Sequence, residues 1–276
     1  MTTPDRPMTS DALVGDLRAV WSSLDALLAS LEDDDWDAPT DCPGWSVQDV
    51  VVHVIGTERQ LQGEAPPDVE VPEGGHLRND IGRMNEAWIL DRRGDEPAEV
   101  LVELRTVVAE RDEALSAMAP EEFEADSWTP AGPGTYGRFM QIRVFDTWIH
   151  EQDIREAVGR RGHLEGPAVQ RTLTEVRNAL PFVVGKRAGA PDGSSVRFEV
   201  TGPEAWTVDV VVEGRARVTD DLEGEPTTTI TTDLPTFIRL AAGRRSGDAV
   251  RADGLVSVSG DQDLGRRVVD AMGYTI

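Results

Sequence analysis

Residues 143–157 read RVFDTWIHEQDIREA, and this stretch decides the fold that we expect for the first part of the chain. Apolar side chains recur here at spacings of three and four, as on a helix that buries one face: Ile142, Phe145 and Ile149. Polar side chains follow a second line along the same helix: Arg143, Asp146, His150 and Asp153. Asp146 and His150 stand four residues apart, which brings their Cβ atoms to about 5–6 Å from each other on one helix face. The stretch therefore predicts a long helix, roughly residues 138–158, with a polar seam beside an apolar face.

Helical spacing also fills most of the chain before this stretch. Helices are predicted over residues 13–31, from 46 onward, over 77–92 and over 97–118. Ser46 and Asp49 have the spacing of a capping box, and Pro97 stands where a first-turn proline belongs. The acidic run Asp33–Asp35 is expected to be a solvated loop, because it lacks the alternating ligand pattern of a calcium-binding EF-hand. Long helices joined by loops predict a four-helix bundle over residues 1–163.

The chain changes character near residues 159–166. One further helix is predicted over 167–185, and helices are also expected over 234–242 and 263–272. Strands are predicted from alternating, β-branched runs bounded by Gly, Pro and Asp: residues 196–200, 206–212, 227–232 and 256–260. Residues 164–276 are therefore expected to form a small α+β domain.

Composition excludes several functional classes. The net charge of −24 over 276 residues argues against binding to nucleic-acid phosphates, which requires clustered Lys and Arg. No apolar run approaches the roughly 18 residues of a membrane helix, and the first ten residues lack the apolar region of a signal peptide. The single cysteine, Cys42, cannot form an intramolecular disulfide. We therefore expect a cytoplasmic protein with no membrane or nucleic-acid partner.

Two of the four histidines interrupt apolar helix faces. His53 lies among valines in DVVVHVIG, and His150 has Asp146 one turn away. A single histidine on an apolar face is usually a hydrogen-bonded core residue, but two on different helices with a nearby carboxylate match a catalytic zinc site. Spacing alone leaves both interpretations open. His76 and His163 lie in Gly-rich polar stretches and are expected to be exposed, with His163 in the linker between domains.

These residues carry a family resemblance. CPGWSVQDVVVHVIGTE (residues 42–58) resembles the Pro-Gly-Trp and Asp-x-x-x-His segment of mycothiol-dependent maleylpyruvate isomerases, and FDTWIHEQDIREAVG (residues 145–159) is similar to their second signature. The family has a DinB-like metal-binding bundle, often followed by a sterol-carrier-like α+β domain, so the resemblance covers nearly the whole chain. It implies metal ligands at His53, Asp146 and His150. The middle ligand is commonly Glu in the characterised isomerases, and the shorter Asp146 weakens the case for that particular reaction.

The resemblance also implies a chemistry. The metal, which we expect to be zinc, would activate the low-molecular-weight thiol mycothiol for addition to a small electrophile. An isomerase would add the thiolate to a conjugated cis double bond, allow rotation and release the thiolate, whereas an S-transferase would stop at the adduct. Arg143 and Arg239 are candidate catalytic residues that clamp a substrate carboxylate, because Arg binds carboxylates through two parallel hydrogen bonds. Both arginines are equally compatible with a solvated surface position, which is the commoner case.

Other motifs favour structural roles. GPGTYG (residues 132–137) matches G-x-G-x-x-G, but no strand or βαβ unit surrounds it, so we interpret it as the loop before the last bundle helix. Cys42 lies between Asp41 and Pro43 without a cationic sequence neighbour, which indicates no activated thiol. Trp45 and Trp148 are expected to pack in the core, although either can line a pocket wall.

A second class of function stays open. The bundle or the α+β domain can serve as a non-catalytic module that binds a small molecule or lipid. Metal binding by His53 and His150 distinguishes the two classes, because an enzyme of this kind requires the cation. The sequence is compatible with a monomer or a homodimer.

Overall fold

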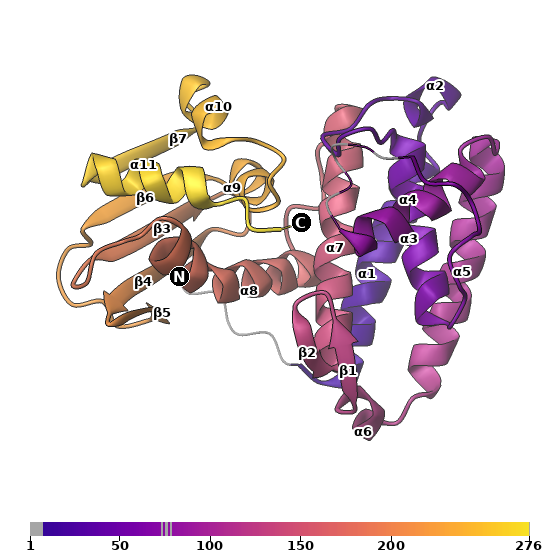
Figure 1. The fold of residues 1–276 in the computed structure, drawn as a ribbon, viewed down its shortest axis with the longest axis horizontal. Helices are drawn as coiled ribbons and strands as arrows, with labels where there is room; N and C mark the ends of the chain where they lie inside the picture. Colours follow the sequence, from indigo (N-terminus) through magenta and orange to yellow (C-terminus); the bar gives the residue numbers. More distant parts are fainter. Residues whose placement is uncertain (1–7, 73, 75–76, 78, 276) are drawn as a thin grey trace. The chain divides into compact units, whose positions relative to one another are not determined.

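The computed structural model describes residues 8–72, 74, 77 and 79–275, which form two compact units (Figure 1). One unit is Met8–Gly162, and the other contains the residues from His163 onward. The first unit is helical and the second is mixed, which confirms the predicted fold class of a helical bundle followed by a small α+β domain.

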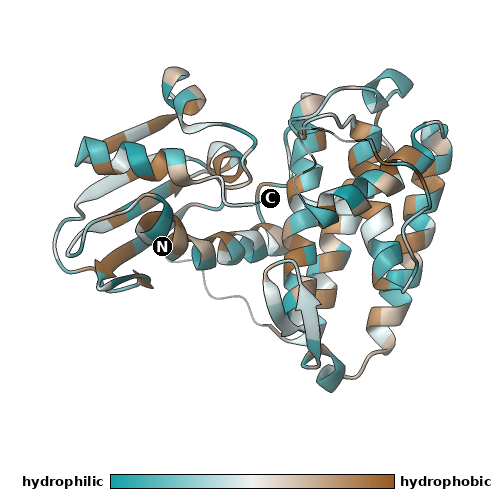
Figure 2. Ribbon diagram, viewed as in Figure 1, coloured by the Kyte–Doolittle hydropathy of each residue, from teal (hydrophilic) through white to brown (hydrophobic). Residues whose placement is uncertain are grey.

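Four long helices build the first unit: α1 (Ser10–Leu28), α3 (Val47–Leu61), α5 (Pro97–Ala117) and α7 (Tyr136–Ala157). Helix α1 packs on α5 and α7, and α3 packs on α5, α7 and the additional helix α4 (Asp80–Arg92). Short helices α2 (Asp33–Trp36) and α6 (Pro120–Phe123) and the hairpin β1 (Asp126–Thr129)–β2 (Gly132–Thr135) complete the unit. Figure 2 shows hydrophobic and hydrophilic bands alternating along the bundle helices, as amphipathic helices require.

The start of α3 follows from its sequence. The Ser46 side chain accepts a hydrogen bond from the backbone N–H of Asp49, and the Asp49 carboxylate accepts one from the N–H of Ser46, so the predicted capping box is present. Farther along α3, Gly56 lies against α4, where a Cβ atom would come within 2.5 Å of Trp88 Cγ. The capping box fixes the residue at which α3 begins, and Gly56 allows the helix to approach α4 closely. Together these two features set the position of His53 along the length of the bundle.

Three local predictions for this unit were wrong. The acidic run Asp33–Asp35 is the short helix α2 instead of a loop; Glu32 and Asp35 form a capping box, and acidic groups in a first turn interact favourably with the helix dipole. The GPGTYG segment is strand β2 followed by the first residues of α7, which therefore begins before residue 138. The described helix α4 begins at Asp80 instead of residue 77, because the Asn79 side chain caps it. His76 lies outside the described residues.

The second unit contains a five-stranded sheet with the strand order β5-β4-β3-β6-β7. Its strands are β3 (Ser195–Thr201), β4 (Trp206–Glu213), β5 (Arg215–Thr219), β6 (Thr228–Asp233) and β7 (Val256–Gly260). Only the central β3–β6 pair is parallel, and Phe198 in β3 lies opposite Val208 on one side and Ile230 on the other. Four of the strands were predicted from the sequence, and β5 was not.

The helices of this unit lie before, between and after its strands in the sequence. They are α8 (Pro167–Pro181), the π-helical turn η1 (Phe182–Arg187), α9 (Leu234–Ala241), α10 (Gly247–Ala252) and α11 (Gln262–Ala271). The helix predicted over 167–185 is therefore α8 continued by a wider turn, which follows a proline that cannot donate a backbone hydrogen bond. No helix among the described residues is both long and apolar enough to cross a membrane.

Candidate metal centre

His53, Asp146 and His150 come together inside the helical bundle. His53 extends from α3, and the other two extend from neighbouring turns of α7. His53 Nε2 lies 3.3 Å from Asp146 Oδ2, and His150 Nε2 lies 3.6 Å from Asp146 Oδ1. The two imidazole rings meet edge to face with 4.6 Å between their centroids. The sequence-predicted residues thus place three donor atoms within 4.8 Å of one another.

This donor set fits a divalent cation. A tetrahedral zinc ion with bonds of about 2.0–2.1 Å to nitrogen and oxygen holds its ligand atoms about 3.4 Å apart. Each imidazole Nε2 lies close to that distance from one oxygen of the carboxylate: His53 is 3.3 Å from Oδ2 and His150 is 3.6 Å from Oδ1. Two imidazole nitrogens and one carboxylate are also the ligand types of catalytic zinc sites. The residues therefore fit the metal that the sequence indicates.

Exposure differs among the three donors. The side chains of His53 and His150 are 6% and 7% exposed, whereas that of Asp146 is 30% exposed. A cation held by this group would be enclosed on the histidine side and reachable from the carboxylate side. Such an open side is what separates a catalytic metal site from a structural one.

The protonation states also suit a metal. Burial, the largest influence, lowers the pKa of His53 despite the opposing hydrogen bond to Asp146. Burial would by itself raise the pKa of Asp146, but Arg143 and the two histidines together hold it well below its usual range. At neutral pH His53 is therefore neutral and Asp146 is ionised, which are the forms that bind cations.

Arg143 is buried, so the expectation of a solvated surface arginine was wrong. Its guanidinium donates from Nε and Nη2 to Glu58 Oε1, at 3.0 and 2.9 Å, and from Nη1 to Asp146 Oδ2. Glu58 also accepts a hydrogen bond at 2.9 Å from Arg111, which is 3% exposed. Arg143 thus holds a candidate ligand in place, and its donors are used within the protein. The other predicted clamp, Arg239, lies on α9 in the second unit and is half-buried.

The chain segment before α3 brings two further side chains to the site. Cys42–Trp45 forms a tight turn with Pro43 and Gly44 at its centre, closed by a 3.0 Å hydrogen bond from Trp45 N–H to the Cys42 carbonyl. Gly44 has a φ of +84°, as the third residue of a type II turn requires. The Trp45 ring centroid lies 5.3 Å from that of His53, and the two ring planes are tilted by 35°. Trp45 also lines a cavity of about 370 Å³ with Asp49 and Arg93, and none of the three donor residues lines this cavity.

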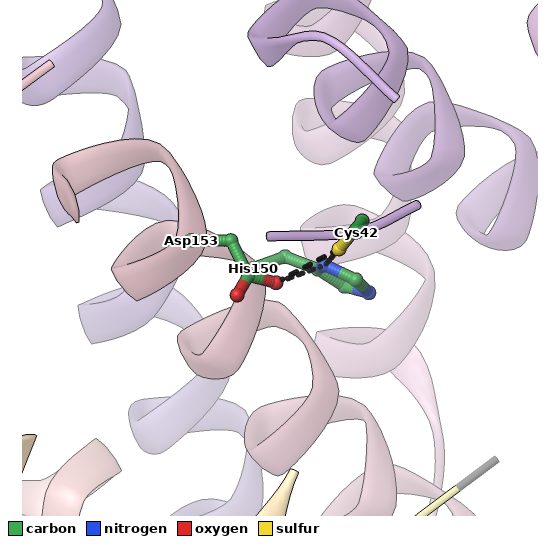
Figure 3. Close-up of side chains that lie close together, drawn as sticks. All are labelled: Cys42, His150 and Asp153. Carbon is green, nitrogen blue, oxygen red and sulfur yellow. Dashed lines mark hydrogen bonds and ion pairs between the residues drawn. The ribbon is translucent and has the colours of Figure 1, made fainter. Parts of the chain in front are cut away.

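Cys42, which the sequence indicated as structural, and Asp153, which it placed on the polar seam, are in contact beside His150, and the sequence did not predict that contact. The Cys42 thiol donates a hydrogen bond of 3.2 Å to Asp153 Oδ2, and its sulfur lies 3.9 Å from His150 Nδ1 (Figure 3). The neighbours of Cys42 along the chain, Asp41 and Pro43, give no sign of this contact. Asp153 does follow His150 at the i+3 position of the polar seam, and this spacing was the available signal.

Comparisons with known proteins cover both units. The family model of the mycothiol maleylpyruvate isomerase N-terminal domain matches residues 17–155, and that of the C-terminal domain of the same family matches residues 172–267. Two uncharacterized proteins of Mycobacterium tuberculosis, from strains CDC 1551 and H37Rv, are each 29% identical over 160 residues, which is 57% of this chain. The matched stretch spans 59% of the length of these relatives.

Solved structures agree with the fold. A crystal structure of the mycothiol-dependent maleylpyruvate isomerase superposes with a TM-score of 0.59 over 94% of this chain and 95% of the other, at 16% identity. A mutant form of that enzyme gives a TM-score of 0.57 with the same coverage. Together with the two family models, which span both the bundle and the α+β unit, these findings show that the chain belongs to the mycothiol maleylpyruvate isomerase family.

Proposed function

We propose that this protein is an enzyme that uses a divalent cation, expected to be zinc, and the thiol mycothiol to modify a small electrophile. The cation would be held by His53, Asp146 and His150. The reaction would be either cis–trans isomerisation, in which the thiol is regenerated, or S-transfer, in which it stays attached. Membership of the mycothiol maleylpyruvate isomerase family supports the thiol and the reaction class.

The observation that carries this proposal is the arrangement of donors around Asp146. Two buried imidazole nitrogens approach the two oxygens of one carboxylate that is 30% exposed, and one donor atom from each residue lies within 4.8 Å of the others. Two histidines that served only to fill the core would not require a shared ionised carboxylate with a solvent-facing side. The geometry therefore favours a cation that an external ligand can reach.

When bound, the cation would supply Lewis acidity and favour the deprotonated form of a coordinating thiol. The protein residues provide the surroundings for that chemistry. Arg143 keeps Asp146 ionised and oriented, and the Trp45 ring lies beside that of His53. The cavity of about 370 Å³ at the start of α3 shares Trp45 with this site, but His53, Asp146 and His150 do not line it, so we do not assign it to the substrate.

The two arginines predicted as carboxylate clamps now differ in what they can contribute. Arg143 would have to release Glu58 or Asp146 before it bound a substrate, so its proposed role is to position the metal ligand. Arg239 remains the proposed carboxylate clamp. Replacing it with Met is expected to raise the KM for a carboxylate-bearing substrate and to leave the metal content unchanged.

The first test is elemental analysis of protein purified without a His tag. We expect about one divalent ion per chain in the wild type, and none in His150→Ala, because the loss of one of three ligands removes most of the affinity. His163→Asn is the matched control: it replaces a histidine outside the donor group, and asparagine tolerates the φ of +52° at this position. Circular dichroism should show equal helix content in all three proteins. Equal metal content in the wild type and His150→Ala would disprove the site.

A second assay distinguishes the reactions. The metal-loaded protein is incubated with mycothiol and maleylpyruvate, and both the thiol and the substrate isomers are quantified. Turnover to the trans isomer at constant thiol concentration indicates an isomerase, and stoichiometric thiol loss indicates a transferase. A metal-loaded protein that supports neither reaction would exclude maleylpyruvate as its electrophile.

A further inference from the structure

The two ring nitrogens of His150 face different partners. Nε2 points to the candidate metal group, 3.6 Å from Asp146 Oδ1. Nδ1 lies 3.0 Å from Asp153 Oδ2, on the opposite side of the ring. A neutral imidazole carries one proton, so only one nitrogen has a free lone pair for a cation. Which nitrogen that is depends on the hydrogen bond at the other one.

Asp153 lies where its hydrogen bond determines which nitrogen of His150 carries the proton. Its side chain is 4% exposed, and one of its oxygens lies within hydrogen-bond distance of both His150 Nδ1 and the Cys42 sulfur. Figure 3 shows Asp153 and His150 extending from α7 toward Cys42, which comes from the loop before α3. A carboxylate oxygen accepts two hydrogen bonds, one from the imidazole N–H and one from the thiol. All three side chains are buried, so water does not compete for these bonds.

We propose that Asp153 and Cys42 are positioning residues that fix His150 with its proton on Nδ1 and its lone pair on Nε2, directed at the cation. Asp153 accepts the Nδ1 proton in a hydrogen bond, and the Cys42 thiol holds the carboxylate in the orientation that receives it. The functional consequence rests on the proposed metal site, but the tautomer itself does not. Carboxylate partners of this kind orient metal-binding histidines in other proteins and raise their basicity.

The same three residues also fit a second hypothesis, a thiolate-containing metal site. Their donor atoms lie within 4.8 Å of one another. Such a site would require the lone pair of Nδ1 and a deprotonated Cys42, whereas the observed distances are accounted for by two hydrogen bonds to one oxygen. A neutral His150 cannot bind a cation through both nitrogens. The hydrogen-bonded arrangement leaves Nε2 for the group that includes His53, so we favour it.

Nuclear magnetic resonance of the metal-free protein tests the tautomer. Two-bond proton–nitrogen spectra of protein labelled with ¹⁵N-histidine, assigned with His150→Gln, are expected to show Nδ1 protonated and Nε2 unprotonated in the wild type. Asp153→Asn should lose this preference, because an amide can turn its NH₂ group toward Nδ1 and move the proton to Nε2. Glu156→Gln, a change at an exposed acid on the same helix, should leave the wild-type pattern. A wild-type His150 protonated on Nε2 would overturn the proposal, whether or not any variant folds.

Metal affinity tests whether the orientation of His150 matters for binding of the cation. In chelator competition with zinc, Asp153→Asn is expected to bind about 10–100-fold more weakly than the wild type. Cys42→Ser should retain the wild-type affinity, because a hydroxyl also donates to Asp153, and Cys42→Ala should bind more weakly than Cys42→Ser. Equal affinities of the Ser and Ala variants would contradict the role of Cys42.

Two further measurements distinguish a failed metal site from a failed positioning role, and the positioning role from metal binding by Cys42. Asp146→Asn should weaken zinc binding but keep the His150 tautomer, so a failed metal site and a failed positioning role give different results. In protein loaded with Co²⁺, we expect no thiolate-to-cobalt charge-transfer band. A band that disappears in Cys42→Ala would assign Cys42, His150 and Asp153 as metal ligands and would overturn the positioning role.

Discussion

At the residue scale, the charge of Asp146 depends on its neighbours. Arg143 donates to one of its oxygens, and His53 lies 3.3 Å from the same oxygen. These contacts outweigh burial and keep the carboxylate ionised. They also mean that a bound cation competes with Arg143 for Asp146. We infer that Arg143 moderates the affinity of the site as well as shaping it, because a neighbouring positive charge opposes a second one.

His53 makes the metal-free protein sensitive to pH. Burial lowers its pKa below the value of 6.5 found in unfolded chains. As the pH falls through 6.5, the unfolded chain takes up a proton that folded His53 does not, so the free energy of unfolding decreases. Asp146 contributes in the same direction only below its own ordinary pKa of 3.8.

The expected outcome is a lower urea midpoint for the metal-free wild type at pH 5.5 than at pH 7.5, with a smaller decrease in His53→Gln. The comparison between the two proteins removes the contribution of all other titrating groups. Equal decreases would show that His53 is protonated in the folded state at pH 5.5.

The sequence predicted the three candidate ligands better than their surroundings. His53 and His150 interrupt apolar helix faces, and the four-residue spacing of Asp146 and His150 is a local signal. The contact between Cys42 and Asp153 joins residues 111 positions apart, and that between Arg143 and Glu58 joins residues 85 apart. Such pairs follow from the packing of α3 and the loop before it on α7, and periodicity along one segment carries no information about them.

At the scale of elements, one carboxylate links three helices of the bundle. Glu58 on α3 accepts hydrogen bonds from Arg111 on α5 and Arg143 on α7, and all three side chains are at most 3% exposed. With Asp146 included, two guanidinium groups face two carboxylates, so the charges of these four groups balance. This balance lets the interior of the bundle contain charged groups close to the candidate metal centre.

Glu58→Gln is therefore expected to lower the free energy of unfolding by about 3–5 kcal/mol, because it leaves buried guanidinium groups without a compensating charge. Glu64→Gln is the matched control. Glu64 also pairs with an arginine, Arg59, but its side chain is 47% exposed, so the expected loss is about 0–1 kcal/mol. Urea denaturation measures both. A loss in Glu58→Gln no larger than that in Glu64→Gln would show that the buried network adds nothing to stability.

Elements with a strong alternating or helical pattern in their sequence were predicted, and elements with a weak pattern were missed. The strands β3, β4, β6 and β7 are marked by β-branched or alternating runs. Strand β5 (Arg215–Thr219) contains two arginines and lies at the sheet edge, where one side has no partner strand among the described residues and polar residues are tolerated. Helix α10 has six residues, too few to show a helical repeat. Hydrophobic patterns in a sequence reflect which side chains are buried, so elements with little buried surface do not show such patterns.

At the scale of the whole molecule, the candidate metal centre belongs to one unit. The three candidate ligands, the turn Cys42–Trp45 and the buried ion pairs of Glu58 all lie within Met8–Gly162. This unit has a hydrophobic core of its own, built from α1, α3, α4, α5 and α7. An independent core is what allows a domain to fold alone. We therefore expect the donor group to assemble without the second unit.

A fragment of residues 8–162 is accordingly expected to fold cooperatively and to bind one divalent ion with the affinity of the full chain. Circular dichroism and chelator competition on the two proteins measure this, and the same fragment carrying His150→Ala provides the blank. If the fragment folds but its affinity falls well below that of the full chain, the second unit contributes to the metal centre. If the affinity is equal and turnover of maleylpyruvate with mycothiol is lost, the second unit acts on the substrate instead, which is the role proposed for Arg239. Retained turnover in the fragment would remove Arg239 from the mechanism and leave the bundle as the complete catalyst.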